Sequence, residues 1–253
     1  MGASFQIMAP SPSTQPPILD PRVNARCLHS WDVTPTEAVR LQNELRSLVL
    51  SRDESPREFR TMAAMDVSYD RRSPWIFAAV VVLRLPTFEV VDQAVVRTRA
   101  TFPYVPGLLS FRESPAGLAA WERLRTQPDC LLCDGHGYAH PRRFGFACHF
   151  GLFVDLPTIG CAKSILVGEY QRLGTKRGGV SDLVHDGDVV GVAVRTREAT
   201  SPVFVSVGHR ISLSRAVETV LACSPRYRIP EPIRCAHALV NRFRQVASIS
   251  SPP

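Results

Sequence analysis

Three consecutive stretches rich in Val, Ile and Phe constrain the fold of this chain most strongly. They span residues 61–69, 75–85 and 88–96, and only short turns containing Arg71-Arg72-Ser73-Pro74 and Pro86-Thr87 separate them. Runs of β-branched and aromatic residues between turn residues are typical of strands joined as hairpins. We therefore expect an antiparallel meander at this place in the chain.

Helical and strand-like segments alternate after this meander. The sequence predicts helices at 115–125, 214–222 and 231–246, strands at 129–133, 158–162, 189–195 and 203–207, and an apolar segment at 149–154. A meander followed by alternating segments indicates an α/β fold with a mixed sheet. We expect antiparallel and parallel strands in this sheet, flanked by helices on its faces.

The N-terminal residues differ in composition from the rest of the chain. They are rich in proline and serine, and Met1–Leu19 carries no charge. Such a segment buries too little apolar area to offset the entropy lost on ordering. We predict a flexible extension over residues 1–30 and a single domain over residues 31–253. A helix is expected near the start of the domain, because Thr34, Pro35 and Glu37 form a capping pattern.

Neither a secretion signal nor a membrane span is expected. The uncharged N-terminal residues lack a basic leader followed by an apolar stretch. The longest apolar run, Trp75–Leu83, is nine residues long. A membrane helix needs about 20 apolar residues. We therefore expect a cytoplasmic protein without a membrane partner.

The charge of the chain favours a polyanionic partner. Its 30 Lys and Arg outnumber its 23 Asp and Glu, which gives a formal net charge of +7. Basic side chains that neutralise phosphates release counterions and so strengthen binding to nucleic acid. Nearly all of this charge is arginine, since only Lys163 and Lys176 are lysines. A GC-rich coding sequence produces the same bias, so charge alone leaves the partner open.

Seven cysteines are scattered through the chain without regular spacing, which favours reduced thiols. Cys130 and Cys133 could suggest a zinc or redox pair. However, they lie in an apolar run, and residues three apart in a strand face opposite sides. We expect two buried thiols.

Two aspartates follow apolar, strand-like runs. Asp66 comes after Met62–Met65, and Asp134 comes after Cys130–Cys133. An ionised group among apolar neighbours must be neutralised, hydrogen-bonded or bound to a cation. Two nearby carboxylates also repel each other unless a cation lies between them. Mg²⁺ fits such a pair, whereas each aspartate alone is equally well explained as a turn or cap residue.

Two further titratable residues have ordinary explanations as well as chemical ones. Glu113 precedes the helix predicted to start at Pro115, where a negative charge is favourable at a helix N-terminus. It could instead be a third acidic group facing a metal ion. His237 lies within the last predicted helix, where a surface or core histidine is the usual outcome.

Six short motifs occur in order along the chain. They are Met65-Asp66-Val67-Ser68-Tyr69, Phe102–Glu113, Cys133-Asp134-Gly135-His136-Gly137, His140-Pro141-Arg142-Arg143, Pro157–Lys163 and Tyr227–Arg234. Together they resemble the motifs of the endonuclease V (deoxyinosine 3′-endonuclease) family. The resemblance covers about residues 35–245, and an ordered set is far more specific than any one motif.

This resemblance implies a ribonuclease H-like core that binds Mg²⁺, for which Mn²⁺ is expected to substitute. It implies an endonuclease acting on DNA or RNA that contains inosine. The expected cut is at the second phosphodiester bond 3′ of deoxyinosine or inosine, leaving 3′-hydroxyl and 5′-phosphate ends. Catalytic positions of the family match Asp66, Glu113, Asp134 and His237, and Lys163 matches a lysine near the cut phosphate. Asp66 and Asp134 would hold the metal ion.

The resemblance also implies how the lesion base is recognised. Tyr104, flanked by Pro103 and Pro106, matches a wedge that fills the gap left when the base flips out. The expected base pocket contains Leu109, Gly135, His140 and Gly145. The glycines, together with Gly137, would let the backbone approach the base closely. Without the resemblance, a buried loop aromatic and a turn-rich loop are the ordinary interpretations.

Two alternatives remain open. One is a nuclease of the same fold with specificity for structure, such as a junction resolvase. The other is a nucleic-acid-binding protein without catalytic activity. The wedge motif Pro103-Tyr104-Val105-Pro106 argues against the first, and repelling carboxylates beside phosphate argue against the second. We expect a monomer.

Overall fold

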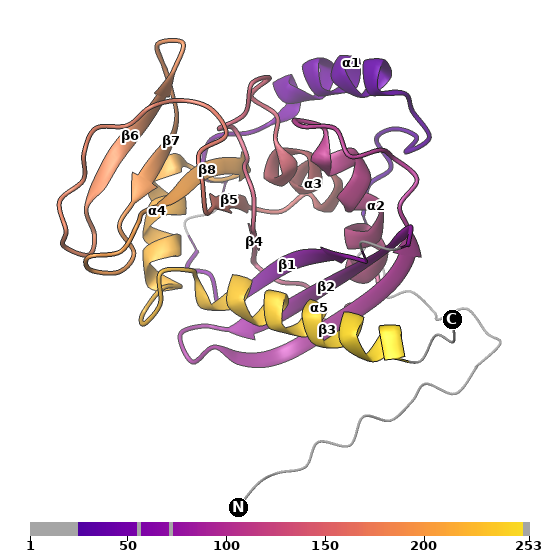
Figure 1. Cartoon of the computed structure of the whole chain (residues 1–253). Coiled ribbons are helices and arrows are strands. Elements are labelled where there is room, and N and C mark those ends of the chain that lie inside the picture. Colours follow the sequence, from indigo (N-terminus) through magenta and orange to yellow (C-terminus); the bar gives the residue numbers. More distant parts are fainter. Residues whose placement is uncertain (1–24, 55–56, 71–72, 250–253) are drawn as a thin grey trace, which may run out of the picture.

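The computed structural model describes residues 25–54, 57–70 and 73–249. An eight-stranded mixed sheet forms the centre of the molecule, with strand order β3-β2-β1-β4-β5-β8-β7-β6 (Figure 1). The strands are β1 Thr61–Tyr69, β2 Trp75–Arg84, β3 Glu89–Arg99, β4 Cys130–Cys133, β5 Thr158–Ala162, β6 Val180–His185, β7 Asp188–Val194 and β8 Val203–His209. The helices are α1 Pro35–Leu45, a short 3₁₀ helix Arg46–Leu48, α2 Leu109–Trp121, α3 Phe146–Val154, α4 Leu213–Ala222 and α5 Glu231–Ile249.

The expected α/β fold with a mixed sheet is confirmed. Strands β1, β2 and β3 pair antiparallel as the predicted meander. Strand β4 pairs parallel with β1, and β5 pairs parallel with β4. The C-terminal ends of β1, β4 and β5 therefore meet at one edge of the sheet. Asp134 and Lys163 directly follow β4 and β5, and Asp66 is the first residue of β1 beyond its pairing with β4.

Helices cover both faces of the sheet, because the side chains of each strand alternate between them. In β1, Ala63 and Met65 enter the core under α2 and α3. Met62 and Ala64 enter the core under α4 and α5 on the other face. The same alternation confirms that Cys130 and Cys133 are buried thiols on opposite faces. All seven cysteines are free.

Helix α1 begins as its capping pattern predicts. The Thr34 hydroxyl accepts a hydrogen bond from the Glu37 amide, the Glu37 carboxylate accepts one from the Thr34 amide, and Pro35 occupies the first turn. The helix packs outside α2 and α3 through Ala38 and Leu45. This position brings α1 over the loops that carry the motifs (Figure 1).

The start predicted for the second helix is wrong. Helix α2 begins at Leu109, so Glu113 and Pro115 lie inside it and Glu113 does not precede its N-terminus. Leu108 at the N-cap makes no side-chain capping bond. The true start therefore carries no signal in the sequence, whereas Pro115 carries a strong but misleading one.

Most of the predicted extension, residues 1–24, lies outside the described residues. Residues 25–30 are described, and Leu28 packs against the core formed by α2 and α3. The Nε2 atoms of His29 and His149 lie 2.7 Å apart. The packed part of the chain therefore begins before Trp31.

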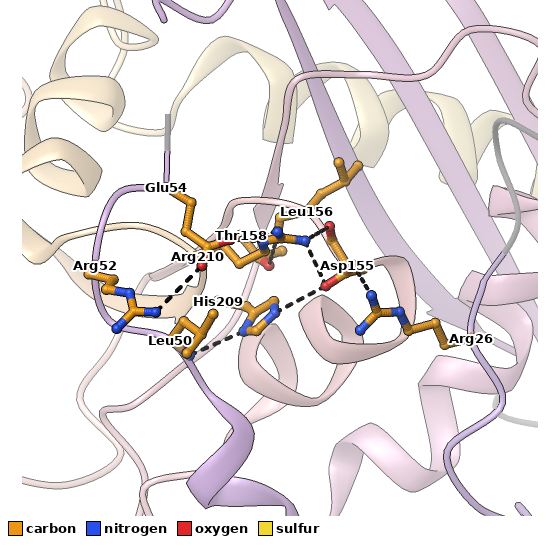
Figure 2. A network of polar contacts seen from close by, with 9 residues as sticks. All are labelled: Arg26, Leu50, Arg52, Glu54, Asp155, Leu156, Thr158, His209 and Arg210. Atoms are coloured by element: carbon orange, nitrogen blue, oxygen red, sulfur yellow. Dashed lines mark hydrogen bonds and ion pairs between the residues drawn. The ribbon is translucent and has the colours of Figure 1, made fainter. Parts of the chain in front are cut away.

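A polar network ties four segments together where α3 and β8 end and β5 begins (Figure 2). Asp155, at the end of α3, pairs with Arg26 and lies 2.8 Å from Arg210 at the end of β8. Arg210 also pairs with Glu54, at 2.5 Å, in the loop after α1. The buried His209 ring accepts a hydrogen bond from the Leu50 amide, at 3.3 Å.

In the part of the chain that the structure describes, we find no helix with the length and apolar character needed to span a membrane.

Candidate active site

Asp66 and Asp134 are neighbours because β1 and β4 are parallel and in register. Met65 is paired with Cys133 across the two strands, and each aspartate is the next residue along its own chain. Both carboxylates are largely shielded, with side chains 15% and 14% exposed. The register of two strands thus brings together two acids that lie far apart in the sequence.

Alternation along β1 sends its polar side chains to different helices. Asp66 lies on the face covered by α5, where it meets His237. Tyr69 lies on the opposite face, where its hydroxyl donates a hydrogen bond to Glu113 of α2. One strand therefore positions a carboxylate directly and a second one through a tyrosine.

His237 contacts Asp66 at the edge of the site. Its Nδ1 lies 2.7 Å from Oδ2 of Asp66, and its Nε2 lies 3.1 Å from the amide nitrogen of Asn241, one turn further along α5. The amide oxygen of Asn241 accepts from Ser68. This leaves its NH₂ to donate to Nε2, so Nδ1–H donates to Asp66. The imidazole is 60% exposed and remains open to a substrate.

The pKa values of Glu113 and Asp66 are raised, because both carboxyl groups are removed from water and lie near other acids. Burial raises the pKa of Glu113 to about 7, the Tyr69 hydrogen bond opposes this, and the charges of Asp66 and Asp134 add to it. Burial also raises the pKa of Asp66, against the hydrogen bond from His237. A divalent cation would relieve this repulsion.

Lys163, just beyond β5, forms an ion pair with Asp134. Its side chain is 45% exposed, so the ion pair leaves part of it open to solvent. Arg228 fixes the backbone of this segment, since its guanidinium donates to the carbonyl oxygen of Lys163 at 2.8 Å. The lysine is thus held at the same edge of the sheet as the acids.

A cavity of about 190 Å³ opens beside the acids. Its wall includes Glu113 and Asp134, and it includes six of the seven residues expected to contact the base. These are Tyr104, Pro106, Leu109, Gly135, His140 and Gly145. Pro103 does not line it. Tyr104 is 70% exposed, so it is not the buried loop aromatic of the ordinary interpretation.

The histidines of this cavity are uncharged at neutral pH. Burial lowers the pKa of both His136 and His140 to about 4. His140 is used structurally: its Nε2 contacts the carbonyl oxygen of Gly107 at 3.0 Å, and its Nδ1 accepts from the Arg142 amide at 3.2 Å. The cavity thus suits an uncharged ligand.

The loop glycines were expected to let the backbone approach a base, but they do not all have this role. A Cβ on Gly137 would lie 2.0 Å from the carbonyl oxygen of Val207, and one on Gly145 would lie 2.5 Å from that of His136. These two glycines permit the loop to pack on β8 and on itself. Gly135 has space, because the nearest atom to its Cβ would be 3.7 Å away on Phe146. Close approach to a ligand remains open for Gly135.

Two supporting residues carried no signal in the motifs. Asn241 orients His237, and its spacing of one helical turn could have indicated this. Gln42 of α1 is buried and donates to the carbonyl oxygens of Gly107 and Phe144, at 3.0 and 3.1 Å. It therefore fixes two sides of the cavity.

The donor atoms fit a hard cation. Asp66 and Asp134 offer carboxylate oxygens that repel each other, and oxygen ligands suit Mg²⁺ or Mn²⁺. No group of three His, Cys, Asp or Glu residues forms a closed cage among the described residues. Mg²⁺ does not need one, because it commonly takes one or two carboxylates and completes its shell with water or phosphate oxygens.

Comparison with known families gives a match over most of the chain. The model of the family described as Endonuclease V matches residues 43–238. The chain belongs to the endonuclease V family. The endonuclease V of Gloeobacter violaceus is 50% identical over 229 residues, which cover 88% of this chain and 93% of that protein.

Solved structures of endonuclease V share the fold. That of Streptomyces avermitilis superposes with a TM-score of 0.83 at 44% identity, covering 87% of this chain and 96% of the other. A Ciona intestinalis endonuclease V, in complex with a 24mer DNA containing an inosine followed by a ribo-adenosine, has a TM-score of 0.73 at 26% identity. The match covers 84% of this chain and 98% of that one. The chain is therefore a nuclease with a ribonuclease H-like fold, as expected.

Proposed function

We propose that this endonuclease V acts on inosine and needs Mg²⁺. The proposed cut is at the second phosphodiester bond 3′ of deoxyinosine or inosine, with 3′-hydroxyl and 5′-phosphate products, and Mn²⁺ substitutes for Mg²⁺. One observation carries this proposal: the cavity with the neutral His136 and His140 also contains Glu113 and Asp134 of the acidic cluster. A base held there lies beside the groups that would cut its own strand. The inosine-containing DNA bound by the Ciona relative supports the choice of base.

Asp66 and Asp134 are the proposed ligands of the metal ion. When bound, the ion neutralises phosphate charge and activates a water molecule. Glu113 is suited to accept a proton near neutral pH, because its pKa is about 7. His237, which Asn241 orients, can hold or pass on a proton at the exposed side of Asp66. Lys163 would turn from Asp134 toward the phosphate.

The cavity is proposed to hold the flipped hypoxanthine. Hypoxanthine is uncharged, which matches the neutral His136 and His140. Its O6 accepts and its N1–H donates a hydrogen bond, so the backbone around Gly135 could distinguish it from adenine. Tyr104 at the rim would stack in the gap that the base leaves, with the stiff residues Pro103 and Pro106 on either side.

The deciding experiment uses end-labelled oligonucleotides with a single deoxyinosine or inosine, in Mg²⁺, in Mn²⁺ and in EDTA. A metal-dependent cut one bond beyond the 3′ neighbour of the lesion is the expected result. The ratio of DNA to RNA rates then identifies the preferred substrate. Cleavage that does not depend on inosine would contradict this proposal and favour a structure-specific nuclease.

A further inference from the structure

A second groove, of about 600 Å³, lies at the same edge of the sheet and shares no lining residue with the base cavity. Its polar lining consists of Lys163, Arg197, Tyr227, Arg228, Arg234 and His237. Among the described residues, no Asp or Glu lines it. A groove with this lining suits a strand that carries both phosphates and bases.

The acids lie between this groove and the base cavity. Lys163 of the groove pairs with Asp134, and His237 of the groove contacts Asp66. Asp134 in turn lines the base cavity. A strand with its base in the cavity and a phosphate at the acids therefore continues into the groove.

The arginines that line the groove differ in how free they are to bind a phosphate. Arg228 is held in place, because its Nε and one Nη donate to the carbonyl oxygens of Ser201, Lys163 and Pro202, each at 2.8 Å. Arg197 is exposed and has no side-chain partner within the described ranges. Of the arginines that line the groove, Arg197 is thus the one most available to a phosphate.

Tyr227 is presented as a flat surface. Its residue is 42% exposed, and the Arg234 guanidinium lies over its ring, 3.4 Å from the centroid. Arg234 is itself held by an ion pair with Glu231 at 2.7 Å. The orientation of the Tyr227 ring is therefore fixed, and part of the ring surface stays exposed. Stacking with a base requires both.

We propose that this groove binds the nucleic-acid strand on the 3′ side of the cut, with a base stacked on Tyr227 and a phosphate on Arg197. The inference rests on the proposed function, which puts the lesion in the cavity on the 5′ side of the cut. The groove across the acids then receives the part of the strand that leaves as the 5′-phosphorylated product.

The test varies the length of the substrate on one side only. Inosine oligonucleotides with the same 5′ part carry from one to about eight nucleotides beyond the cut, a range that covers one strand-binding site. With wild-type protein, kcat/KM is expected to rise about tenfold over this series. Tyr227→Ala and Arg197→Ala should flatten the rise and match wild type on the shortest substrate. Tyr227→Phe, which keeps the ring, should preserve it.

Arg226→Ala is the matched control, because Arg226 is exposed next to Tyr227 but does not line the groove. It removes the same charge as Arg197→Ala and should leave the length dependence intact. If both substitutions reduce the length dependence equally, the dependence comes from the overall positive charge of this surface and not from binding in the groove.

A binding measurement separates the inference from catalysis. A fluorescent, 5′-phosphorylated oligonucleotide with the sequence of the 3′ product is titrated in EDTA and followed by anisotropy. Tyr227→Ala should weaken binding about tenfold, and Arg226→Ala should not. Wild-type cleavage at inosine whose kcat/KM stays the same along the whole 3′ length series overturns the inference alone. Absence of inosine-directed cleavage in the whole series overturns the proposed function.

Discussion

The Nδ1 atom of His237 lies 2.7 Å from Oδ2 of Asp66, although 171 positions separate the two residues in the chain. The contact joins α5 to β1 across the face of the sheet. It gives the buried carboxylate a donor and opposes the rise in its pKa that burial causes. His237 thereby affects both the orientation and the charge of a proposed metal ligand.

His237→Ala is expected to lower inosine-directed cleavage about 10- to 100-fold, the usual cost of losing a group that orients a metal ligand. His237→Asp should retain more activity, because aspartate keeps a group that can take up a proton at this place. Steady-state rates over a Mg²⁺ titration measure both effects. Equal rates for His237→Ala and wild type at every Mg²⁺ concentration would remove His237 from the mechanism.

Asp66→Asn and Asp134→Asn are expected to abolish cleavage while substrate binding survives. Each change removes one carboxylate charge from the pair and keeps the shape of the side chain. Single-turnover cleavage and anisotropy with an uncut inosine oligonucleotide measure the two properties separately. Cleavage at the wild-type rate in either variant would contradict the proposed metal site.

Much of the fold could be predicted because burial leaves a clear pattern. Strand β1 and strand β5 have the predicted bounds, 61–69 and 158–162, since apolar runs end where these strands end. Strand β6 was missed because it is an edge strand with a mixed burial pattern and only Leu183 fully buried. An edge strand that is mostly exposed has no apolar run to reveal it.

The site was harder to predict than the fold. Asp66 and Asp134 come after recognisable apolar strand segments, so the sequence alone marks them as candidate metal ligands. Their meeting with Glu113 and His237 depends on which face of the sheet each helix covers, and local spacing does not contain this information. Glu113 was open as a third acid from the sequence, and only the resemblance gave His237 a role in the site. Asn241 and Gln42 act through other residues and lay outside the quoted motifs.

Tyr104→Ala is expected to reduce the preference for inosine over adenosine about tenfold, because a stacking partner is lost. The residue is 70% exposed, so the free energy of unfolding should change by less than about 0.5 kcal/mol. Tyr104→Phe is the control and should keep the preference. An unchanged ratio of inosine to adenosine rates in Tyr104→Ala would exclude the wedge.

Glu113→Gln is expected to stabilise the metal-free protein at high pH. The pKa of Glu113 is about 7 in the folded protein, against an ordinary value of 4.5. Its contribution to stability is therefore fully present below pH 4.5 and is lost as the pH rises through about 7. At about pH 8, removing the buried charge should raise the free energy of unfolding by about 2 kcal/mol.

This gain in stability should disappear as the pH falls to about 4.5, where position 113 is uncharged in the folded state of both wild type and Glu113→Gln. Denaturant unfolding in EDTA at several pH values measures the difference. Glu122→Gln is the control, because Glu122 is exposed at the other end of α2. A pH-independent difference between Glu113→Gln and wild type would show that Glu113 does not titrate differently on folding.

Asp155→Asn is expected to destabilise the fold without touching the active site. Asp155 accepts from Arg26 and Arg210 and lies 3.5 Å from His209 (Figure 2). Asparagine keeps the shape and tolerates the left-handed backbone, which has φ of 52° here. Loss of charged hydrogen bonds should lower the free energy of unfolding by about 2 kcal/mol.

Asp186 offers a matched control, since it has φ of 55° and a side chain 77% exposed. Asp186→Asn should change stability by less than about 0.5 kcal/mol. Equal unfolding midpoints for the two variants would mean that this network contributes nothing beyond a surface ion pair.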